Sequence, residues 1–273
     1  MKSTLCHKNF VCSFFVLTLG CVLLFITSCG IVDPVERTHE NIYQASSDFN
    51  YEIAAGAGKV LEISNINGPI TVTGVTNSTT VRLWGARAAG SDTEADAEAF
   101  LEKVAIDFSE SKEKISVETS QPNETNGRDV SVVYYARIPY DWSVKIENIN
   151  GACQVDSLGG EVSVKLTNGN TLLRQIHGNA YVAVTNGQVE GALYMPANGH
   201  IQMRSTNGLI QLLLPQSTSA RLSASVTNGS VQVEGLELSE SKGTRRSIEA
   251  TIGSGDGRIE LATTNGNILV KGM

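Results

Sequence analysis

The histidines are the first candidates for metal or acid–base chemistry in this sequence of 273 residues. Three of them lie beyond the apolar N-terminal segment: His39, His177 and His200. A zinc site needs a second His, a Cys or an Asp at a short and defined spacing, and none of the three has such a neighbour. We therefore expect no bound metal and no cofactor.

Acidic residues and one glycine-rich segment are the next candidates for catalysis or calcium binding. Carbohydrate-cleaving β-helices place acids on neighbouring coils, but Glu190 and Glu234 each precede a Gly and are typical of solvated turns. Residues 253–257 resemble a calcium-binding glycine-rich repeat, which binds metal only when consecutive coils repeat it, and here it occurs once. No Ser has a His and an acid in a recognisable nucleophile setting. The sequence therefore predicts a protein that is not an enzyme.

Cys29 is the position at which a covalent modification is expected. Basic residues precede an apolar segment, residues 11–26, which continues into Ile26-Thr27-Ser28-Cys29. A basic start, an apolar run and small residues before a Cys are typical of a lipoprotein signal peptide that is cleaved at the Cys. We expect residues 1–28 to be removed and Cys29 to carry a lipid such as palmitate. A plain signal peptide and an N-terminal membrane helix stay open, because the apolar run is almost long enough to span a bilayer.

The other cysteines and the net charge indicate an exported protein without disulfides. Three cysteines leave with the signal peptide, so Cys153 has no intramolecular partner and is expected to be a buried small hydrophobe. Cleavage of the signal peptide removes Lys2 and Lys8 and no acidic residue, so the formal net charge changes from −7 to −9. Such a balance argues against binding nucleic acid or anionic lipid headgroups by charge.

The tripeptide Thr-Asn-Gly occurs five times in the second half of the chain, between short runs of alternating apolar residues. Ile-Asn-Gly takes its place twice earlier, ending at Gly68 and Gly151. From Gly151 onward the glycines are 18 or 21 residues apart, except for a last step of 37. A strand-forming repeat near this length is typical of a β-solenoid or a β-meander. The repeat residues that we expect to form a structural ladder are Asn168, Gly169, Asn186, Gly187, Asn207, Gly208, Asn228, Gly229, Asn265 and Gly266.

Two all-β architectures fit this repeat. Asn-Gly is a strong hairpin signal, because type I′ turns need positive φ at both central residues, and it favours an antiparallel β-meander. In a β-solenoid (β-helix), coils stack about 4.8 Å apart, so that identical Thr and Asn side chains superpose as ladders. Gly then supplies a left-handed bend at the corner, beside an Asn that tolerates the same region. A meander does not require identical residues at the same place in successive repeats, so we expect a β-solenoid of about 20-residue coils.

The chain divides into a tether and one β-repeat domain. Residues 29–50 carry charges without periodicity and are expected to be the tether. Residues 51–273 form the domain, with a helix-containing insertion at about 75–145. A capping box at Ser91 and Glu94, followed by an apolar stripe, predicts one short α-helix over about 91–103, which would cover the first coil.

The other end of the domain has two notable segments. A charged loop at residues 237–246 explains the long last step of the repeat. The chain then stops on the strand Ile268-Leu269-Val270. We expect this final strand to be an uncovered edge at which the protein self-associates or docks to a partner.

The segments Ile-Ser-Asn-Ile-Asn-Gly-Pro-Ile-Thr-Val-Thr-Gly (63–74) and Ile-Glu-Asn-Ile-Asn-Gly-Ala-Cys-Gln-Val (146–155), followed by serial Thr-Asn-Gly repeats, carry a resemblance. The chain, over about residues 58–273, resembles the bacterial putative adhesin family of envelope β-strand-repeat proteins, a domain of unknown function. The resemblance implies a β-helical solenoid that is exported or membrane-anchored. It implies no catalytic residues.

These observations predict a lipid-anchored β-solenoid of the bacterial cell envelope that acts as a non-enzymatic scaffold or adhesin-like binding module. Because Gly30 rather than Asp follows Cys29, we expect the outer membrane if the cell has two membranes. An envelope stress-response or assembly accessory and a polysaccharide-active β-helix enzyme are the alternatives. We rank a protein partner or self-association above a glycan, since the repeat region offers only Tyr181 and Tyr194 as stacking rings.

Overall fold

The computed structural model describes residues 40–56 and 59–273. The chain divides into two units, Met1–Arg37 and Thr38–Met273, and the described residues belong to the second. The signal peptide, Cys29 and the first half of the expected tether, residues 29–39, therefore lie outside the described residues. Strand β1, Tyr43–Ala54, begins inside that tether, so the expectation that it extends to residue 50 is wrong. Phe49, Tyr51 and Ile53 alternate with polar residues in β1 and pack against the core.

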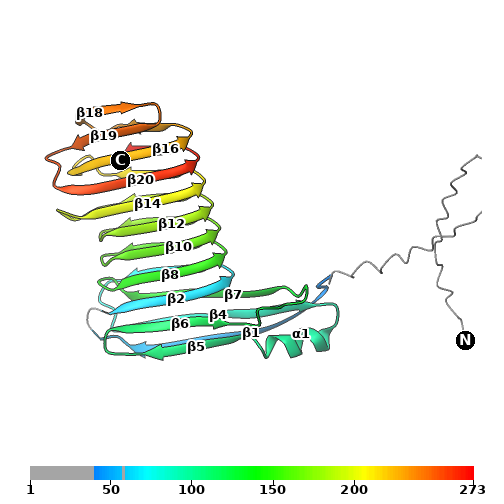
Figure 1. Ribbon diagram of the computed structural model, residues 1–273. Helices are drawn as coiled ribbons and strands as arrows, with labels where there is room; N and C mark the ends of the chain where they lie inside the picture. The colour runs from blue at the N-terminus through cyan, green and yellow to red at the C-terminus, as the bar shows by residue number, and fades with distance from the viewer. Residues whose placement is uncertain (1–39, 57–58) are drawn as a thin grey trace, which may run out of the picture. The chain divides into compact units, whose positions relative to one another are not determined.

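The strands of the second unit form two large sheets (Figure 1). Sheet A has ten strands in the spatial order β1-β4-β7-β3-β9-β11-β13-β15-β21-β17, and sheet B has eleven in the order β18-β19-β16-β20-β14-β12-β10-β8-β2-β6-β5. Besides β1, sheet A contains β3 (Ile70–Val75), β4 (Thr80–Ser91), β7 (Val130–Pro139), β9 (Cys153–Leu158), β11 (Thr171–Ile176), β13 (Val189–Leu193), β15 (Ile210–Leu214), β17 (Val231–Glu234) and β21 (Ile268–Gly272). Sheet B contains β2 (Val60–Asn67), β5 (Ala105–Glu110), β6 (Lys114–Ser120), β8 (Ser143–Asn150), β10 (Val162–Asn168), β12 (Ala180–Asn186), β14 (His200–Asn207), β16 (Ala220–Asn228), β18 (Leu238–Thr244), β19 (Ser247–Ile252) and β20 (Gly257–Asn265).

The repeat region is a solenoid-like stack of strand pairs, each with one strand in sheet B and the following strand in sheet A. Neighbouring pairs are parallel and in register, so that Asn168 of β10 lies beside Asn150 of β8 and Asn186 of β12. The antiparallel meander is therefore wrong for this region. At each Asn-Gly corner the chain crosses to the other sheet rather than folding back as a hairpin.

Alternating side chains from both sheets fill the space between them. In β10, Val162, Val164 and Leu166 point inward and are buried, while the residues between them face outward. Where β14 contributes the longer Met203, β13 has Gly191, at which an added Cβ would lie 2.9 Å from the Met203 Cε atom. A large side chain of one sheet thus lies opposite a residue without a side chain in the other sheet, which keeps the core filled.

The last coil in the sequence is not the last coil of the stack. Strand β21 pairs with β15 on one side and β17 on the other, and β20 lies in the same way between β14 and β16 (Figure 1). Asn265 accordingly lies beside both Asn207 and Asn228. The expectation of an uncovered C-terminal edge is therefore wrong, and a docking edge on β21 is excluded because both of its sides are paired.

The segment that was expected to be a charged loop, residues 237–246, contributes to a hairpin instead. Strands β18 and β19 pair antiparallel, and β19 pairs with β16, so the hairpin covers this end of sheet B. At the same end, the edge of sheet A is β17, where the Val231 amide donates to the Arg245 carbonyl at 2.9 Å. Exposed charges on β18, such as Glu240 and Lys242, are typical of edge strands that resist further pairing.

At the other end, β6 and β5 extend sheet B, and β7, β4 and β1 extend sheet A beyond the first coil. Helix α1, Glu94–Leu101, packs on β1 and β4. Its N-cap is Thr93, whose Oγ1 accepts from the Asp96 amide at 3.2 Å, so the expected capping box at Ser91 is wrong. Ser91 ends β4 and donates a hydrogen bond to the Asp96 carboxylate instead. No helix within residues 40–56 and 59–273 has the length and apolar character of a membrane span.

Candidate functional site

The Asn-Gly corners bring the expected ladder residues together in one column. From Asn150 onward, each Asn side-chain amide donates to the side-chain oxygen of the Asn in the preceding coil of the stack, at 2.7 to 2.8 Å. Because the C-terminal coil is inserted, the spatial order of the ladder differs from the sequence order. In space it runs Asn67, Asn150, Asn168, Asn186, Asn207, Asn265 and Asn228.

The glycine of each corner provides the sharp change of direction. Gly169, Gly187 and Gly208 have φ values of 141°, 144° and 158°, and the other corner glycines are similar. A Cβ at any of these positions would lie closer than 3.0 Å to a backbone carbonyl oxygen of the adjacent coil. The Asn residues end their strands without positive φ, so the expected left-handed Asn is wrong.

A second set of polar side chains lies inside the first corners. Buried Asn65 donates to the carbonyl oxygens of Val132 and Gly68, at 2.9 and 3.2 Å, and buried Asn148 donates to the Gly68 carbonyl at 3.0 Å. Ser205 and Thr263 bond to corner carbonyls in later coils. Sequence reasoning missed these residues, although the pattern Asn-x-Asn-Gly at Asn65 and Asn148 marks them.

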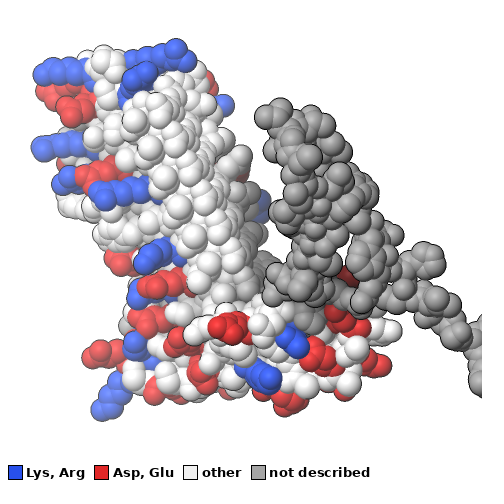
Figure 2. All heavy atoms as spheres, turned by 45° about the vertical axis from the view of Figure 1, so that its right-hand side comes forward, with Lys and Arg blue, Asp and Glu red and all other residues white. Residues whose placement is uncertain are grey.

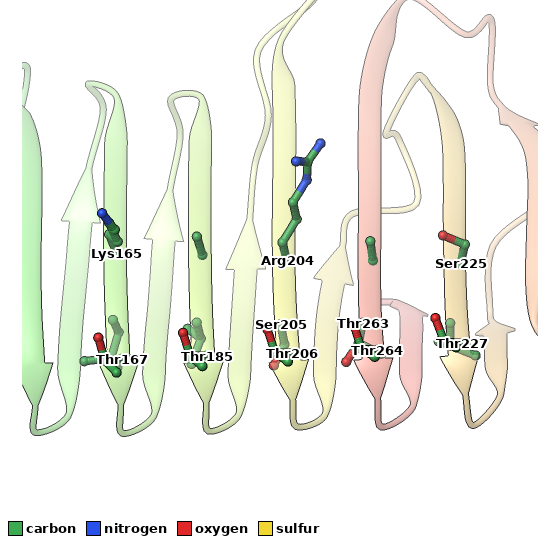
Figure 3. Close-up of a pocket in the computed structure, with 15 residues that line it drawn as sticks. Lys165, Thr167, Thr185, Arg204, Ser205, Thr206, Ser225, Thr227, Thr263 and Thr264 are labelled. Carbon is green, nitrogen blue, oxygen red and sulfur yellow. The ribbon is translucent and has the colours of Figure 1, made fainter.

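A groove runs across five coils of sheet B, on the outer face beside the ladder (Figure 3). It has a volume of about 550 Å³. Its floor includes a row of hydroxyl groups, one from each coil. Lys165 and Arg204 lie earlier on their strands than the threonines, as Figure 3 shows. The hydroxyl row consists of Thr167, Thr185, Thr206, Thr264 and Thr227, in spatial order. We call this surface the threonine groove.

The side of the stack that carries the Asn-Gly corners has little charge. In Figure 2 this side comes forward, and a long strip of the stack is free of Lys, Arg, Asp and Glu, which gather mainly to one side of it and around its upper and lower ends. An uncharged surface of this length differs from the rest of a protein whose formal net charge is −7. The strip presents hydroxyl and amide groups to whatever it contacts.

A cluster of aromatic and arginine side chains lies on the outer face of sheet A. Trp84 of β4 and Tyr135 of β7 are directly opposite each other, with ring centroids 5.6 Å apart and planes tilted by 20°. The guanidinium groups of Arg82 and Arg137 lie 5.2 and 5.7 Å from the Trp84 ring centroid. Tyr135 is 41% exposed. We call these four residues the aromatic–arginine cluster.

Sequence reasoning missed this cluster because Trp84 and Tyr135 come from strands of the irregular N-terminal part. The available signal was the alternation of Val81 and Leu83 with Arg82 and Trp84, which places the last two on the outer face. The two tyrosines of the repeat region, Tyr181 and Tyr194, contact histidine rings instead. Tyr194 stacks on His177 with centroids 4.7 Å apart, and Tyr181 meets the edge of His200 at 5.3 Å.

Charged residues gather around the outer face of β20. The Glu260 carboxylate accepts hydrogen bonds from Gln202 and Arg258, which hold its pKa below its usual range against the opposing effect of burial. His200 Nε2 lies 3.4 Å from the same carboxylate and pairs with it when protonated. Within residues 40–56 and 59–273, no three His, Cys, Asp or Glu side chains are placed to hold one metal ion.

The remaining candidates for chemistry are turn or core residues. In the glycine-rich corner, Asp256 accepts hydrogen bonds from Ser254 and Ser219, and these lower its carboxyl pKa. Glu190 and Glu234 are exposed on different strands of sheet A, and Glu234 pairs with Lys271 at 3.4 Å. Cys153 is free and buried, and burial raises the pKa of its thiol to about 11, as fits a core residue.

Comparison with known proteins agrees with this architecture. A putative cell adhesion protein from Clostridium sporogenes is 13% identical with a TM-score of 0.50, over 84% of this chain and 100% of that chain. A putative adhesin from Bacteroides fragilis is 10% identical with a TM-score of 0.39, over 83% of this chain and 97% of that chain. At 13% identity, the likeness to the Clostridium sporogenes structure concerns the fold alone. A search of the curated proteins finds no match to the sequence.

A protein-family profile, described as Toastrack DUF4097, matches residues 61–271. The match covers the first coil, the N-terminal insertion, all later coils and the β18–β19 hairpin. It confirms the resemblance drawn from the Ile-Asn-Gly and Thr-Asn-Gly segments. The chain belongs to the Toastrack family of domains of unknown function, DUF4097.

Proposed function

We propose that this protein is a non-enzymatic binding module of the bacterial cell envelope, which is anchored by a lipid on Cys29 and binds its partner along the threonine groove. The observation that carries the proposal is the groove itself, in which five coils present the same hydroxyl group in register. A continuous polar surface of this kind suits an extended partner, which can meet equivalent groups at successive coils. The partner that we expect is a protein of the envelope.

The adhesion part of the proposal has a second source of support. The Clostridium sporogenes structure is described as a putative cell adhesion protein, and its fold resembles this one. We extend that description to this chain as part of the proposal. The scarcity of charge on the corner side adds to it, because a neutral hydroxyl and amide surface loses less solvation free energy on contact than a charged one.

The anchor is tested at Cys29. We expect Cys29→Ser to abolish incorporation of radiolabelled palmitate and to leave uncleaved precursor in the membrane fraction. The reason is that the thiol of this residue is the acyl acceptor in the expected lipoprotein signal. Cys153→Ser is the matched control, and it should keep both labelling and processing, since Cys153 is buried in the core. Labelling that persists in Cys29→Ser would refute the anchor.

The groove is tested by photo-crosslinking in cells. A benzoylphenylalanine residue at Thr206, at the centre of the row, should crosslink the full-length protein to the same partner as one at Thr185. The same probe at Gln211, on the outer face of sheet A, is the control and should give no such product. A partner crosslinked from Gln211 and from neither groove position would move the binding surface to the other sheet and contradict the proposal.

A further inference from the structure

We propose that the aromatic–arginine cluster is a binding site for a saccharide that carries a carboxylate, separate from the threonine groove. The cluster is on sheet A and the groove is on sheet B, so neither depends on the residues of the other. The inference rests on three features of the cluster: an open ring face, a pair of arginines that contact one ring, and fixed polar groups within reach.

The open ring face belongs to Tyr135. On one side its neighbour is Trp84 of β4, and on the other side its neighbour is Thr71 of β3. Thr71 has a short side chain, so the face of the tyrosine ring on that side has no bulky neighbour, and the residue is 41% exposed. Aromatic rings exposed on a flat surface are the usual stacking partners of flat apolar ligand faces, and a sugar ring has such a face. Trp84 supports the tyrosine ring from behind.

The positive charge comes from two arginines that face each other. Arg82 and Arg137 are directly opposite in the antiparallel pair of β4 and β7, an arrangement of like charges that is unfavourable by itself. Both guanidinium groups lie against the Trp84 ring, a contact that limits their orientations. Arg82 Nε donates to the Asn50 side chain at 3.2 Å. On its other side Arg82 is directly opposite Glu52 of β1, whereas Arg137 lies beside Thr73 of β3. A planar anion such as a carboxylate, bound at Arg137, offsets the repulsion between the two arginines.

The polar groups lie on the next strands of sheet A. Beyond the short side chains of Thr71 and Thr73, strand β9 presents Gln154 and Asp156, whose side chains are joined by a hydrogen bond of 2.5 Å. Fixed amide and carboxylate groups accept hydrogen bonds from sugar hydroxyls. The surface over β3 thus has the Tyr135 ring for stacking on one side and the polar groups of β9 for hydrogen bonds to sugar hydroxyls on the other. The arginine pair provides the positive charge for the carboxylate.

A single-stranded nucleic acid also combines rings with negative charge, but the surroundings disfavour it. The chain carries a formal net charge of −7, and Glu52 and Asp156 flank the cluster on β1 and β9. Binding of a polyphosphate backbone needs a continuous basic surface, whereas two arginines suffice for one carboxylate.

The experiment measures binding of polygalacturonate to the full-length protein in neutral detergent. Trp84 and Trp142 are the two tryptophans of the sequence, and Trp142 is buried, so protection from acrylamide quenching reports on Trp84. We expect Arg137→Gln to weaken polygalacturonate binding by about tenfold or more, as loss of a charged hydrogen bond does. Tyr135→Leu should weaken binding of both polygalacturonate and its neutral methyl ester. Arg221→Gln, on β16 of sheet B and outside the threonine groove, is the matched control and should bind as the unchanged protein does.

The methyl ester separates the two parts of the site. It should bind the unchanged protein more weakly than the acid does, and Arg137→Gln should not weaken it further. Absence of polygalacturonate binding, equal affinity in Arg137→Gln, or equal competition by an oligothymidylate would each overturn the inference. Each result leaves the groove crosslinks at Thr206 unaffected, so a failure here is distinguishable from a failure of the proposed function.

Discussion

Replacement of Gly187 by Ala is expected to lower the free energy of unfolding by about 4 kcal/mol, or to prevent folding at 37 °C. Gly187 has φ of 144°, a conformation that residues with a Cβ rarely adopt. The added Cβ would also meet the carbonyl oxygen of Gly169 in the adjacent coil. Both atoms belong to backbone that is paired with further coils, so neither can move without breaking the register. Urea unfolding followed by circular dichroism measures the loss.

Three control variants separate the causes. Gly235 also has positive φ, 67°, but an added Cβ there would be no nearer than 3.6 Å to other atoms, so Gly235→Ala should cost only about 1 kcal/mol. Asn186→Ala removes ladder hydrogen bonds next to Gly187 and should cost about 1 kcal/mol. Asn123, exposed and outside the ladder, should tolerate Ala without measurable loss. A Gly187→Ala variant no less stable than Gly235→Ala would contradict the stacking argument.

The corner residues were predictable because each copy of the repeat carries the same information. Thr-Asn-Gly between alternating apolar runs sets the strand, its outward residues and its end, and parallel stacking of equal copies then superposes them. The conformation of the Asn was not predictable in this way. Asn-Gly occurs in hairpins with positive φ at both residues, whereas a corner between two sheets requires it at the Gly alone.

The spatial order of the coils could not be predicted from the repeat. β14, β16 and β20 all end in Thr-Asn and are followed by Gly, so any of them offers the same pairing surface to the next coil. The choice depends on the β18–β19 hairpin, which pairs antiparallel with β16 and so occupies the side that a further coil would need. The aromatic–arginine cluster was hidden for a related reason. Its residues are near each other only through the β4–β7 pairing, which joins strands that are far apart in the sequence.

The second large effect on stability is expected at Leu269, in the C-terminal coil that is inserted between two earlier coils. We expect Leu269→Pro to lower the free energy of unfolding by about 3 kcal/mol or more, because proline removes a ladder hydrogen bond from a strand with two neighbours. Leu269 lies between Gln211 of β15 and Gln232 of β17. If β21 were the free edge that its place in the sequence suggests, the same change would be mild. Thermal unfolding of the full-length protein measures the difference.

Gln232→Pro is the matched control, since Gln232 lies directly beside Leu269 but on edge strand β17, which has a single partner in sheet A. It should cost about half as much, because an edge strand loses pairing on one side only. Hydrogen exchange adds a spatial test. In Leu269→Pro, amides of β15 and β17 should lose protection together, although 16 residues separate the two strands in sequence. Loss of protection confined to β21 would contradict the prediction, because it would mean that the last coil frays independently. The coil β16–β17 would then have to be held to the stack by contacts other than those with β20 and β21.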